Sequence, residues 1–372
     1  QGNINGRNYN LTKCHTVAYM AMCMFRQAFL EDEIASIEPS FSSGILDEQG
    51  KDVPLLSIVT DSYKGGYVNT VSRGSHNKEF NQQWIDSGIP HRLQYYDYNS
   101  SYPAIMQKFD IPTRYDRMEH GEQIETLDSL DDHCLYVCKV KYPEGKCGLL
   151  LKAMGMCIAP SEIPYSYIDY QQKTRPIQRF SVHWGYELKE ALLSGAEITS
   201  QHRYYFFAEK LLSKFVTYFY NRRLSEGQGI NPETLAPIPG ANPDDVISLF
   251  CKLMMNSLYG KFGQALMAKI VFCYSVATWR SHFKKDEDII DIKFSPPTPR
   301  YAGHMEVTLL DQKRAYLGQF NFIASFITAC ARTRLIEHMR VLTDTCKNKL
   351  GLPPVIYCYD TDSVQHDELD PS

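Results

Sequence analysis

The sequence predicts an α+β fold in which long amphipathic helices are attached to a strand-rich body. Apolar residues recur at helical spacing over 207–223, 244–260 and 319–347. Other segments are short apolar runs bounded by Gly, Pro and Asn, as is typical of strands. One of these runs, "PPVIYCYDTDSVQ" (353–365), ends in two aspartates one residue apart.

Each remaining element follows from the same two patterns. Further helices are predicted over 11–30 and at the start of 184–206, where Gly195 gives a turn. A linker rich in Gly, Pro and Asn (226–244) separates two helices that should lie antiparallel. Strands are predicted at the end of 63–71, over 93–97, in a hairpin within 134–152, at the end of 184–206, over 304–310 and over 353–360. Pro103 should stop the strand that begins at residue 93, and the polar stretch 31–53 should be irregular.

The composition is that of an ordinary globular protein, with 44% hydrophobic and 22% charged residues. The net charge of −4 does not by itself indicate a nucleic-acid-binding protein. No apolar run approaches the roughly 20 residues that span a bilayer, and no signal peptide is visible. The eleven cysteines include no C-x-x-C pair, which favours free thiols in a reducing compartment. The first residue is not Met, so we expect a fragment or a processed chain.

Two aspartates at one strand end are unfavourable neighbours. Like charges repel, and burying Asp360 or Asp362 without a positive partner is costly. A lone D-x-D is often only a turn. Asp97 also ends an apolar strand, however, and two strand ends that meet across a sheet would hold two Mg²⁺ ions through Asp97 and Asp362. Such an ion pair activates an attacking hydroxyl and stabilises the leaving oxygen in phosphoryl transfer.

The segment "KLMMNSLYGKFG" (252–263) predicts a binding face on a helix. Lys252, Asn256 and Tyr259 lie at i, i+4 and i+7, which places them on one side. A lysine suits a triphosphate, an aromatic ring suits a base, and Gly260 lets a base pair approach closely. An amphipathic surface helix whose tyrosine packs in the core would show the same pattern.

These motifs resemble those of a known enzyme family. "DYNSSYP" (97–103), "KLMMNSLYG" (252–260) and "YDTDS" (359–363) resemble, in this order, motifs A, B and C of family B DNA polymerases. The Asn of the first motif and the form of the second resemble the protein-primed branch found in bacteriophages, adenoviruses and linear plasmids. "YKGGYV" (63–68) is similar to that branch's Y-x-G-G motif, and "TACAR" (328–332) to its T-x-x-A-R element.

The resemblance implies a right-hand polymerase with an antiparallel-sheet palm and a two-helix fingers subdomain. We expect a linking segment with Y-x-G-G over 1–90, palm with motif A and an insertion over 91–205, fingers with motif B over 206–263, and an insertion and palm with motif C over 264–372. Acidic exonuclease motifs and the lysine element of a thumb are absent from the sequence. The chain should therefore be the palm and fingers core of a longer polymerase.

The resemblance also implies a role for each matching residue. The catalytic carboxylates would be Asp97, Asp360 and Asp362, of which Asp97 and Asp362 bind metal. The incoming nucleotide would meet Tyr102, Lys252, Asn256 and Tyr259, with Tyr102 beneath the sugar. Primer or template would be contacted by Tyr63, Gly65, Gly66, Ser100, Thr328 and Arg332. Arg222 and Arg223 lie near where the family's other fingers helix ends.

The implied activity is that of a DNA-directed DNA polymerase. It would transfer deoxynucleotides to a primer 3′-hydroxyl, or to a hydroxyl of a terminal protein, with two Mg²⁺ ions or with Mn²⁺. The implied partners are primer–template DNA, dNTPs and a terminal protein. The protein would be a monomer without a membrane contact, inside the cytoplasm, nucleus or mitochondrion of a host cell.

Two positions depart from the family pattern. The usual Tyr-x-Asp-Thr-Asp becomes Cys358-Tyr359-Asp360, which moves the aromatic ring to the other face of the strand. Ser101 replaces a common Leu, and we expect both changes to be tolerated.

Three alternatives remain. A metal-dependent nucleotide-sugar glycosyltransferase also uses D-x-D, but it needs neither the Asp97 motif nor the Lys252 helix. A catalytically dead DNA-binding relic would keep the fold, although all three motif carboxylates are intact. A calcium loop fits poorly, because Val364 and Gln365 occupy positions that need an acid and a glycine.

Overall fold

The structure is a computed structural model. It describes residues 2–4, 6–11, 14, 16–37, 41–47, 50–66, 68–70, 86, 93–141, 165–168, 174–177, 181–263, 268–273, 289–295, 304–310, 320–350 and 356–367. No helix within these ranges is long and apolar enough to span a membrane.

A four-stranded antiparallel sheet joins the carboxylate-bearing strands. Its order is β5 (Val68–Thr70), β17 (Ile356–Asp360), β18 (Ser363–Asp367) and β6 (Leu93–Asp97). The pairing of β18 with β6 places Ser363 opposite Asp97. Two segments that are far apart in the sequence thus end at the same edge, as the sequence predicted.

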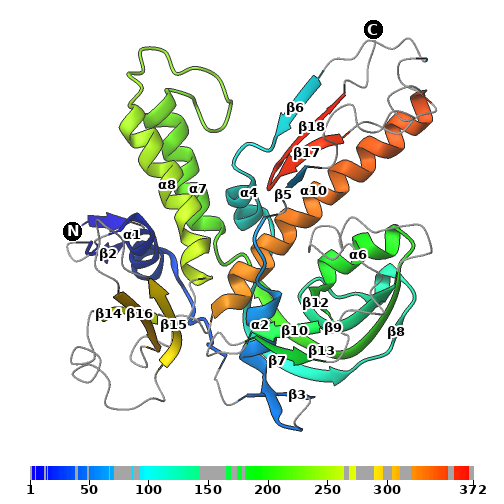
Figure 1. Cartoon of the computed structure of the whole chain (residues 1–372). Coiled ribbons are helices and arrows are strands. Elements are labelled where there is room, and N and C mark those ends of the chain that lie inside the picture. The colour runs from blue at the N-terminus through cyan, green and yellow to red at the C-terminus, as the bar shows by residue number, and fades with distance from the viewer. Residues whose placement is uncertain are drawn as a thin grey trace.

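Helix α10 (Asn321–Leu350) runs diagonally through the molecule and supports this sheet (Figure 1). It also packs against α2 (Leu55–Ser62), α4 (Ser101–Lys108) and α6 (Gly185–Leu193). Its first turns are mostly apolar and buried on all sides, which is the pattern of a central helix.

A second sheet lies on the other side of α10. Its order is β12 (Ser181–Trp184), β9 (Cys134–Lys141), β13 (Glu197–Glu209) and β7 (Ile111–His120), with β8 (Gln123–Ile124) also paired to β13. The rings of Trp184, Tyr136 and Tyr204 are fully buried in this part of the molecule. Glu190 of α6 pairs with Arg340 of α10 at 3.0 Å, so the sheet is also tied to the helix.

Two helices stand side by side at one flank of the four-stranded sheet (Figure 1). They are α7 (Ser213–Arg222), extended by the π-helix η3 (Arg223–Gly227), and α8 (Asp245–Phe262). Asp244 caps α8 by accepting hydrogen bonds from two backbone N–H groups of its first turn. α1 (Val17–Met24) and the π-helix η1 (Phe25–Phe29) pack against their bases, where Phe25 meets Phe215 and Phe262 edge-on.

The remaining described elements are small. They are β1 (Gly2–Ile4), β2 (Arg7–Tyr9), β3 (Ser42–Leu46), β4 (Asp52–Pro54), the 3₁₀ helix η2 (Leu127–Ser129), β10 (Tyr165–Ile168), β11 (Thr174–Ile177), β14 (Ala268–Cys273), β15 (Ile289–Ser295) and β16 (His304–Leu310).

The helices over 244–260 and 319–347 and the strand over 304–310 are confirmed. The predicted helix over 11–30 begins later, at Val17. The expected hairpin within 134–152 shows its first strand, whereas residues 142–152 lie outside the described residues.

Three other expectations were wrong in part. Residues 207–209 end a long strand, so the helix expected over 207–223 begins only at Ser213. The stretch 31–53 contains strands rather than only irregular chain. Pro103 does not simply stop a strand, because it lies in the first turn of α4, where proline's missing N–H is tolerated.

Asp61 offers a test of the packing around α2. Its carboxyl group is buried, and burial raises its pKa to about 6 from an ordinary 3.8. The folded protein therefore binds this proton more tightly than the unfolded chain, and the associated stability is lost as the pH rises from about 4 through 6. We expect Asp61→Asn to raise the unfolding free energy by about 3 kcal/mol at neutral or higher pH.

The measurement is urea unfolding between acid and neutral pH. The variant should lose less stability than the unsubstituted protein as the pH rises, while Asp32→Asn, an exposed carboxylate, should change nothing. Parallel pH profiles for Asp61→Asn and the unsubstituted protein would contradict the buried, protonated state of Asp61.

Candidate active site

The carboxylates of Asp97 and Asp362 lie beside each other at the edge of the four-stranded sheet. The backbone N–H of Tyr98 donates to the carbonyl oxygen of Asp362 at 2.9 Å, which joins the two strand ends. Both aspartates line one cleft of about 450 Å³. The sequence prediction that they share a site is consistent with this placement.

The turn between β17 and β18 is tight and strained. Thr361 has a φ of +56°, which is unusual for a β-branched residue. Its hydroxyl donates to Oδ1 of Asp360 at 3.0 Å, and the N–H of Asp362 donates to the carbonyl of Asp360 at 2.5 Å. A left-handed residue of this kind costs on the order of 1–3 kcal/mol, so the surrounding structure must hold it.

The charges of Asp97 and Asp360 disfavour the ionised form of Asp362 and favour a cation beside it. Burial, followed by the charges of Asp97 and Asp360, raises the pKa of Asp362 above its ordinary value. A divalent cation between the two strand ends would relieve this repulsion, so the donor set fits a hard metal ion. No group of three or more His, Cys, Asp or Glu side chains in the described residues is arranged to hold a metal. Backbone, water and phosphate oxygens would have to complete the coordination.

The opposite wall of the cleft comes from α7, η3 and α8. On α8, Lys252 and Asn256 are exposed and face the cleft, whereas Met255 and Leu258 are buried. Arg223 also lines the cleft, and its Nη1 lies 3.5 Å from Oγ of Ser100. The sequence assigned Arg223 no site role, although its position at the end of a helix opposite the Lys252 face was a usable signal.

Tyr102 and Tyr259 form one aromatic surface beside the carboxylates. Their rings are stacked, with centroids 4.4 Å apart and planes inclined by 11°. Burial, and then Tyr259, raise the pKa of Tyr102 well above its ordinary value, so its hydroxyl stays protonated. Tyr102 reaches this position because Ser100, with a φ of +56°, turns the chain from β6 into α4.

The Y-x-G-G segment packs against both walls of the site. A Cβ added to Gly66 would lie 2.5 Å from Oγ1 of Thr361, whereas one added to Gly65 would meet nothing within 4 Å. A Cβ on Gly263, at the end of α8, would lie 2.4 Å from Cζ of Tyr63. The segment is thus a spacer between the carboxylate turn and the base of α8.

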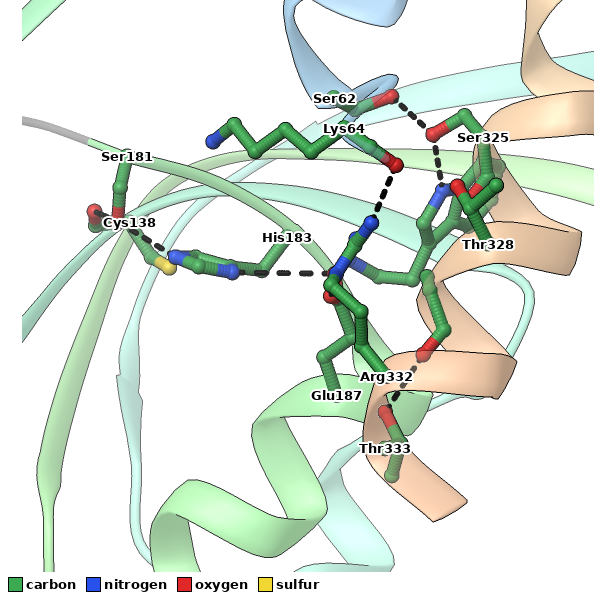
Figure 2. A network of polar contacts seen from close by, with 12 residues as sticks. Ser62, Lys64, Cys138, Ser181, His183, Glu187, Ser325, Thr328, Arg332 and Thr333 are labelled. Carbon is green, nitrogen blue, oxygen red and sulfur yellow. Dashed lines mark hydrogen bonds and ion pairs between the residues drawn. The ribbon is translucent and has the colours of Figure 1, made fainter. Parts of the chain in front are cut away.

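Thr328 and Arg332, which were expected to contact primer or template, lie on α10. Both side chains are buried on α10, and Thr328 donates to the carbonyl of Ser325. Figure 2 shows Arg332 directed into the protein, where Nη1 donates to the carbonyl of Lys64 at 2.5 Å and of Gly65 at 3.1 Å. The chain uses this arginine to hold the Y-x-G-G segment. A contact of Thr328 or Arg332 with primer or template stays a prediction.

Arg332 also forms a buried ion pair with Glu187 of α6, at 2.7 Å (Figure 2). Burial opposes ionisation of Glu187, but Arg332 and His183 hold its pKa well below the usual range. Removing one member of such a pair leaves an uncompensated buried charge, at a cost of about 3–5 kcal/mol.

A second contact, two helical turns earlier on α10, holds Ser62, the residue of α2 that directly precedes this segment. Oγ of Ser325 lies 2.6 Å from Oγ of Ser62 and accepts a hydrogen bond from Nε1 of Trp184 at 2.8 Å. Ser325 and Arg332 are seven residues apart, which places them on one face of the helix. The segment is therefore fixed on α10 at two points.

Comparison with known proteins gives one family match. The family described as DNA polymerase type B, organellar and viral, matches residues 3–303. The matched range includes Asp97 and the α8 face and ends before α10 and Asp362.

Several individual proteins are also similar. A "Probable DNA polymerase" of Neurospora intermedia is 23% identical over 365 residues, covering 96% of this chain and 30% of that protein. A "Probable DNA polymerase" of Ascobolus immersus is 21% identical over 378 residues, covering 98% of this chain and 25% of that protein. Among solved structures, Phi29 DNA polymerase complexed with single-stranded DNA has a TM-score of 0.48 at 16% identity, covering 95% of this chain and 48% of that one. The chain thus spans less than a third of the length of each of these two relatives.

The contact between Gly66 and Thr361 leads to a test of the spacer. Gly66→Ala should lower the unfolding free energy by about 1–3 kcal/mol, because the new methyl group overlaps the Thr361 side chain. Gly65→Ala is the matched control and should be neutral or slightly stabilising. Chemical denaturation of both variants measures the difference.

A second substitution separates this contact from a general loss of packing. Thr361→Gly removes the side chain that the methyl group meets, so Gly66→Ala combined with Thr361→Gly should regain most of the lost stability. Equal effects of alanine at positions 65 and 66 would show that the close approach is not important.

Proposed function

This chain belongs to the organellar and viral type B DNA polymerases, and we propose that it carries the polymerising centre of a template-directed DNA polymerase. In this proposal deoxynucleotides are transferred to a primer 3′-hydroxyl, or to a hydroxyl of a protein primer. Because the chain spans under a third of its two fungal relatives, the activity belongs to the full-length protein.

The proposal is carried by one observation: a single cleft is lined by paired carboxylates and by a lysine and an asparagine of α8. Asp97 and Asp362 form one wall, and Lys252 and Asn256 of α8 form another. Paired carboxylates suit metal-assisted phosphoryl transfer, and a lysine opposite them suits the phosphates of a nucleotide. A nucleotide-sugar transferase would need the D-x-D turn but not this second wall.

We assign the following roles to the residues of the cleft. Asp97 and Asp362 hold two divalent cations, with Asp360 as a supporting carboxylate. When bound, Mg²⁺ or Mn²⁺ would activate the attacking hydroxyl and stabilise the leaving oxygen. Lys252, with Arg223 beside it, binds the triphosphate and orients it along the cleft.

The aromatic surface would select the sugar and the base. Tyr102 lies beneath the sugar, Asn256 contacts the nucleotide, and Tyr259 contacts the nascent base pair. The stacking of Tyr102 on Tyr259 supports a shared surface for both parts of the substrate. Ser100, Tyr63 and the two glycines of Y-x-G-G contact primer or template.

The larger organisation is part of the same proposal. The four-stranded sheet with α10 corresponds to a palm, and α7 with α8 to two-helix fingers, within the ranges 1–90, 91–205, 206–263 and 264–372. We further propose protein priming and, as partners, primer–template DNA, dNTPs and a terminal protein. The resemblance of "YKGGYV" and "KLMMNSLYGKF" to the protein-primed branch supports this assignment.

Asp97→Asn and Asp362→Asn test the metal role. Each should lower nucleotide incorporation by the full-length protein on the order of a thousand-fold, because one metal ligand is lost, while DNA binding stays nearly unchanged. Asp128→Asn, an exposed carboxylate on η2, is the control. A loss under about tenfold for either active-site variant would contradict the two-metal mechanism.

Tyr102 tests the polymerase assignment at the level of substrate choice. A ring packed against C2′ excludes a hydroxyl by a clash, so Tyr102→Val should raise the relative use of ribonucleotides roughly 10²-fold while keeping much of the deoxynucleotide activity. Tyr102→Phe keeps the ring and should keep the discrimination. The measurement is the ratio of kcat/KM for the two nucleotides; an unchanged ratio in Tyr102→Val would mean that the ring only packs.

A further inference from the structure

Asp97 lies on a strand that is held weakly by its own sheet. β6 pairs with β18 on one side and forms the edge of the sheet within the described part of the chain. An edge strand has hydrogen bonds along one side only, so its last residue can shift unless something else fixes it. Contacts from outside the sheet must therefore fix the end of β6.

The residues on either side of Asp97 point the other way. Successive side chains of a strand alternate between its faces, so Tyr96 and Tyr98 share one face and Asp97 lies on the other. Val364 and His366 of β18, which are buried, are on the same face as the two tyrosines. This is the face that α10 covers.

Tyr98 makes the closest contacts with α10. Its hydroxyl lies 3.0 Å from Nδ1 of His338, and the two rings meet edge-on with centroids 5.6 Å apart. The guanidinium carbon of Arg334, one turn earlier on the helix, lies 4.9 Å from the centroid of the same ring. Tyr98 is therefore held by a hydrogen bond, a ring contact and a cation.

Tyr96 adds a second attachment to the same face. Its ring stacks on His366 with centroids 5.3 Å apart and planes inclined by 6°, and it lies 6.3 Å from the ring of His338. A small cavity of about 110 Å³ on this face is lined by Tyr96, Tyr98 and His338, and also by residues Asp97 and Asp362. His338 thus borders the same space as the two strand ends that carry the aspartates.

The backbone carries the restraint to both carboxylates. Tyr98 follows Asp97 directly, and its N–H donates to the carbonyl of Asp362 at 2.9 Å. A shift of the Tyr98 ring would therefore move the end of β6 and strain the bond to the β17–β18 turn. The hydrogen bond between the Tyr98 hydroxyl and His338 therefore also restrains the point where the end of β6 meets Asp362.

We propose that His338 is a positioning residue for this metal centre: through its hydrogen bond to Tyr98 it sets the separation of Asp97 and Asp362. His338 touches neither the reacting atoms nor the nucleotide. The proposal rests on the proposed function for the metal site and for the activity readout, but metal binding by the two carboxylates can be measured without any substrate.

The test uses the full-length protein and Mn²⁺ as the probe. Tyr98→Phe and His338→Phe each remove the hydrogen bond while keeping an aromatic ring, and the double variant removes both partners. We expect each single variant to weaken Mn²⁺ binding, measured by electron paramagnetic resonance without nucleotide, roughly tenfold. kcat should fall by a similar factor, whereas KM for dNTP should change by less than about twofold.

Three comparisons make the test specific. The double variant should lose no more than either single variant, because all three break the same bond. His338→Asn can place a polar atom near Nδ1 and should recover most of the affinity. Tyr95→Phe is the matched control, since Tyr95 is the neighbouring tyrosine of β6, 58% exposed on the other face.

The outcomes that overturn the proposal are distinct. Additive losses in the double variant, or unchanged Mn²⁺ affinity with only a lower melting temperature, would show that His338 merely packs. If the unsubstituted protein binds Mn²⁺ but incorporates no nucleotide, the proposed function fails and the Mn²⁺ affinities still decide the role of His338. No Mn²⁺ binding by the unsubstituted protein would overturn both.

Discussion

The repulsion among three carboxylates at one sheet edge is the constraint on which the rest of the structure depends. Asp97, Asp360 and Asp362 lie at neighbouring strand ends, and the pKa of Asp362 is raised by burial and by the other two. The fold holds this edge with a strained turn at Thr361 and with a backbone hydrogen bond from Tyr98.

Much of this restraint comes from a single helix. α10 holds the Y-x-G-G segment through Ser325 and Arg332, and that segment packs against Thr361 through Gly66. Further along, α10 contacts Tyr98. Ser62, Ser325, Arg332 and Glu187 are buried and satisfied by one another, so they cost little in the folded state but are expensive to break singly.

The sequence predicted the elements with strong periodicity and the meeting of Asp97 with the β17–β18 turn, because recognisable motifs carried both. It failed at 207–212, where the strand β13 continues to Glu209 and a turn follows before α7 begins at Ser213. Pro103 was ambiguous, since proline both stops strands and begins helices. The burial of Arg332 and the contact of His338 were beyond reach, because each depends on partners more than a hundred residues away.

The spacing of contacts along α10 has a consequence for how this protein can vary. Ser325 and Arg332 hold the stretch 62–65, and His338 holds Tyr98, all from one continuous helix. Each added residue turns an α-helix by about 100°. One residue inserted between Ser325 and His338 would leave the first contact in place and rotate the last one away from its partner. This stretch can therefore accept substitutions but not changes of length, whereas the exposed linker between η3 and α8 can accept both.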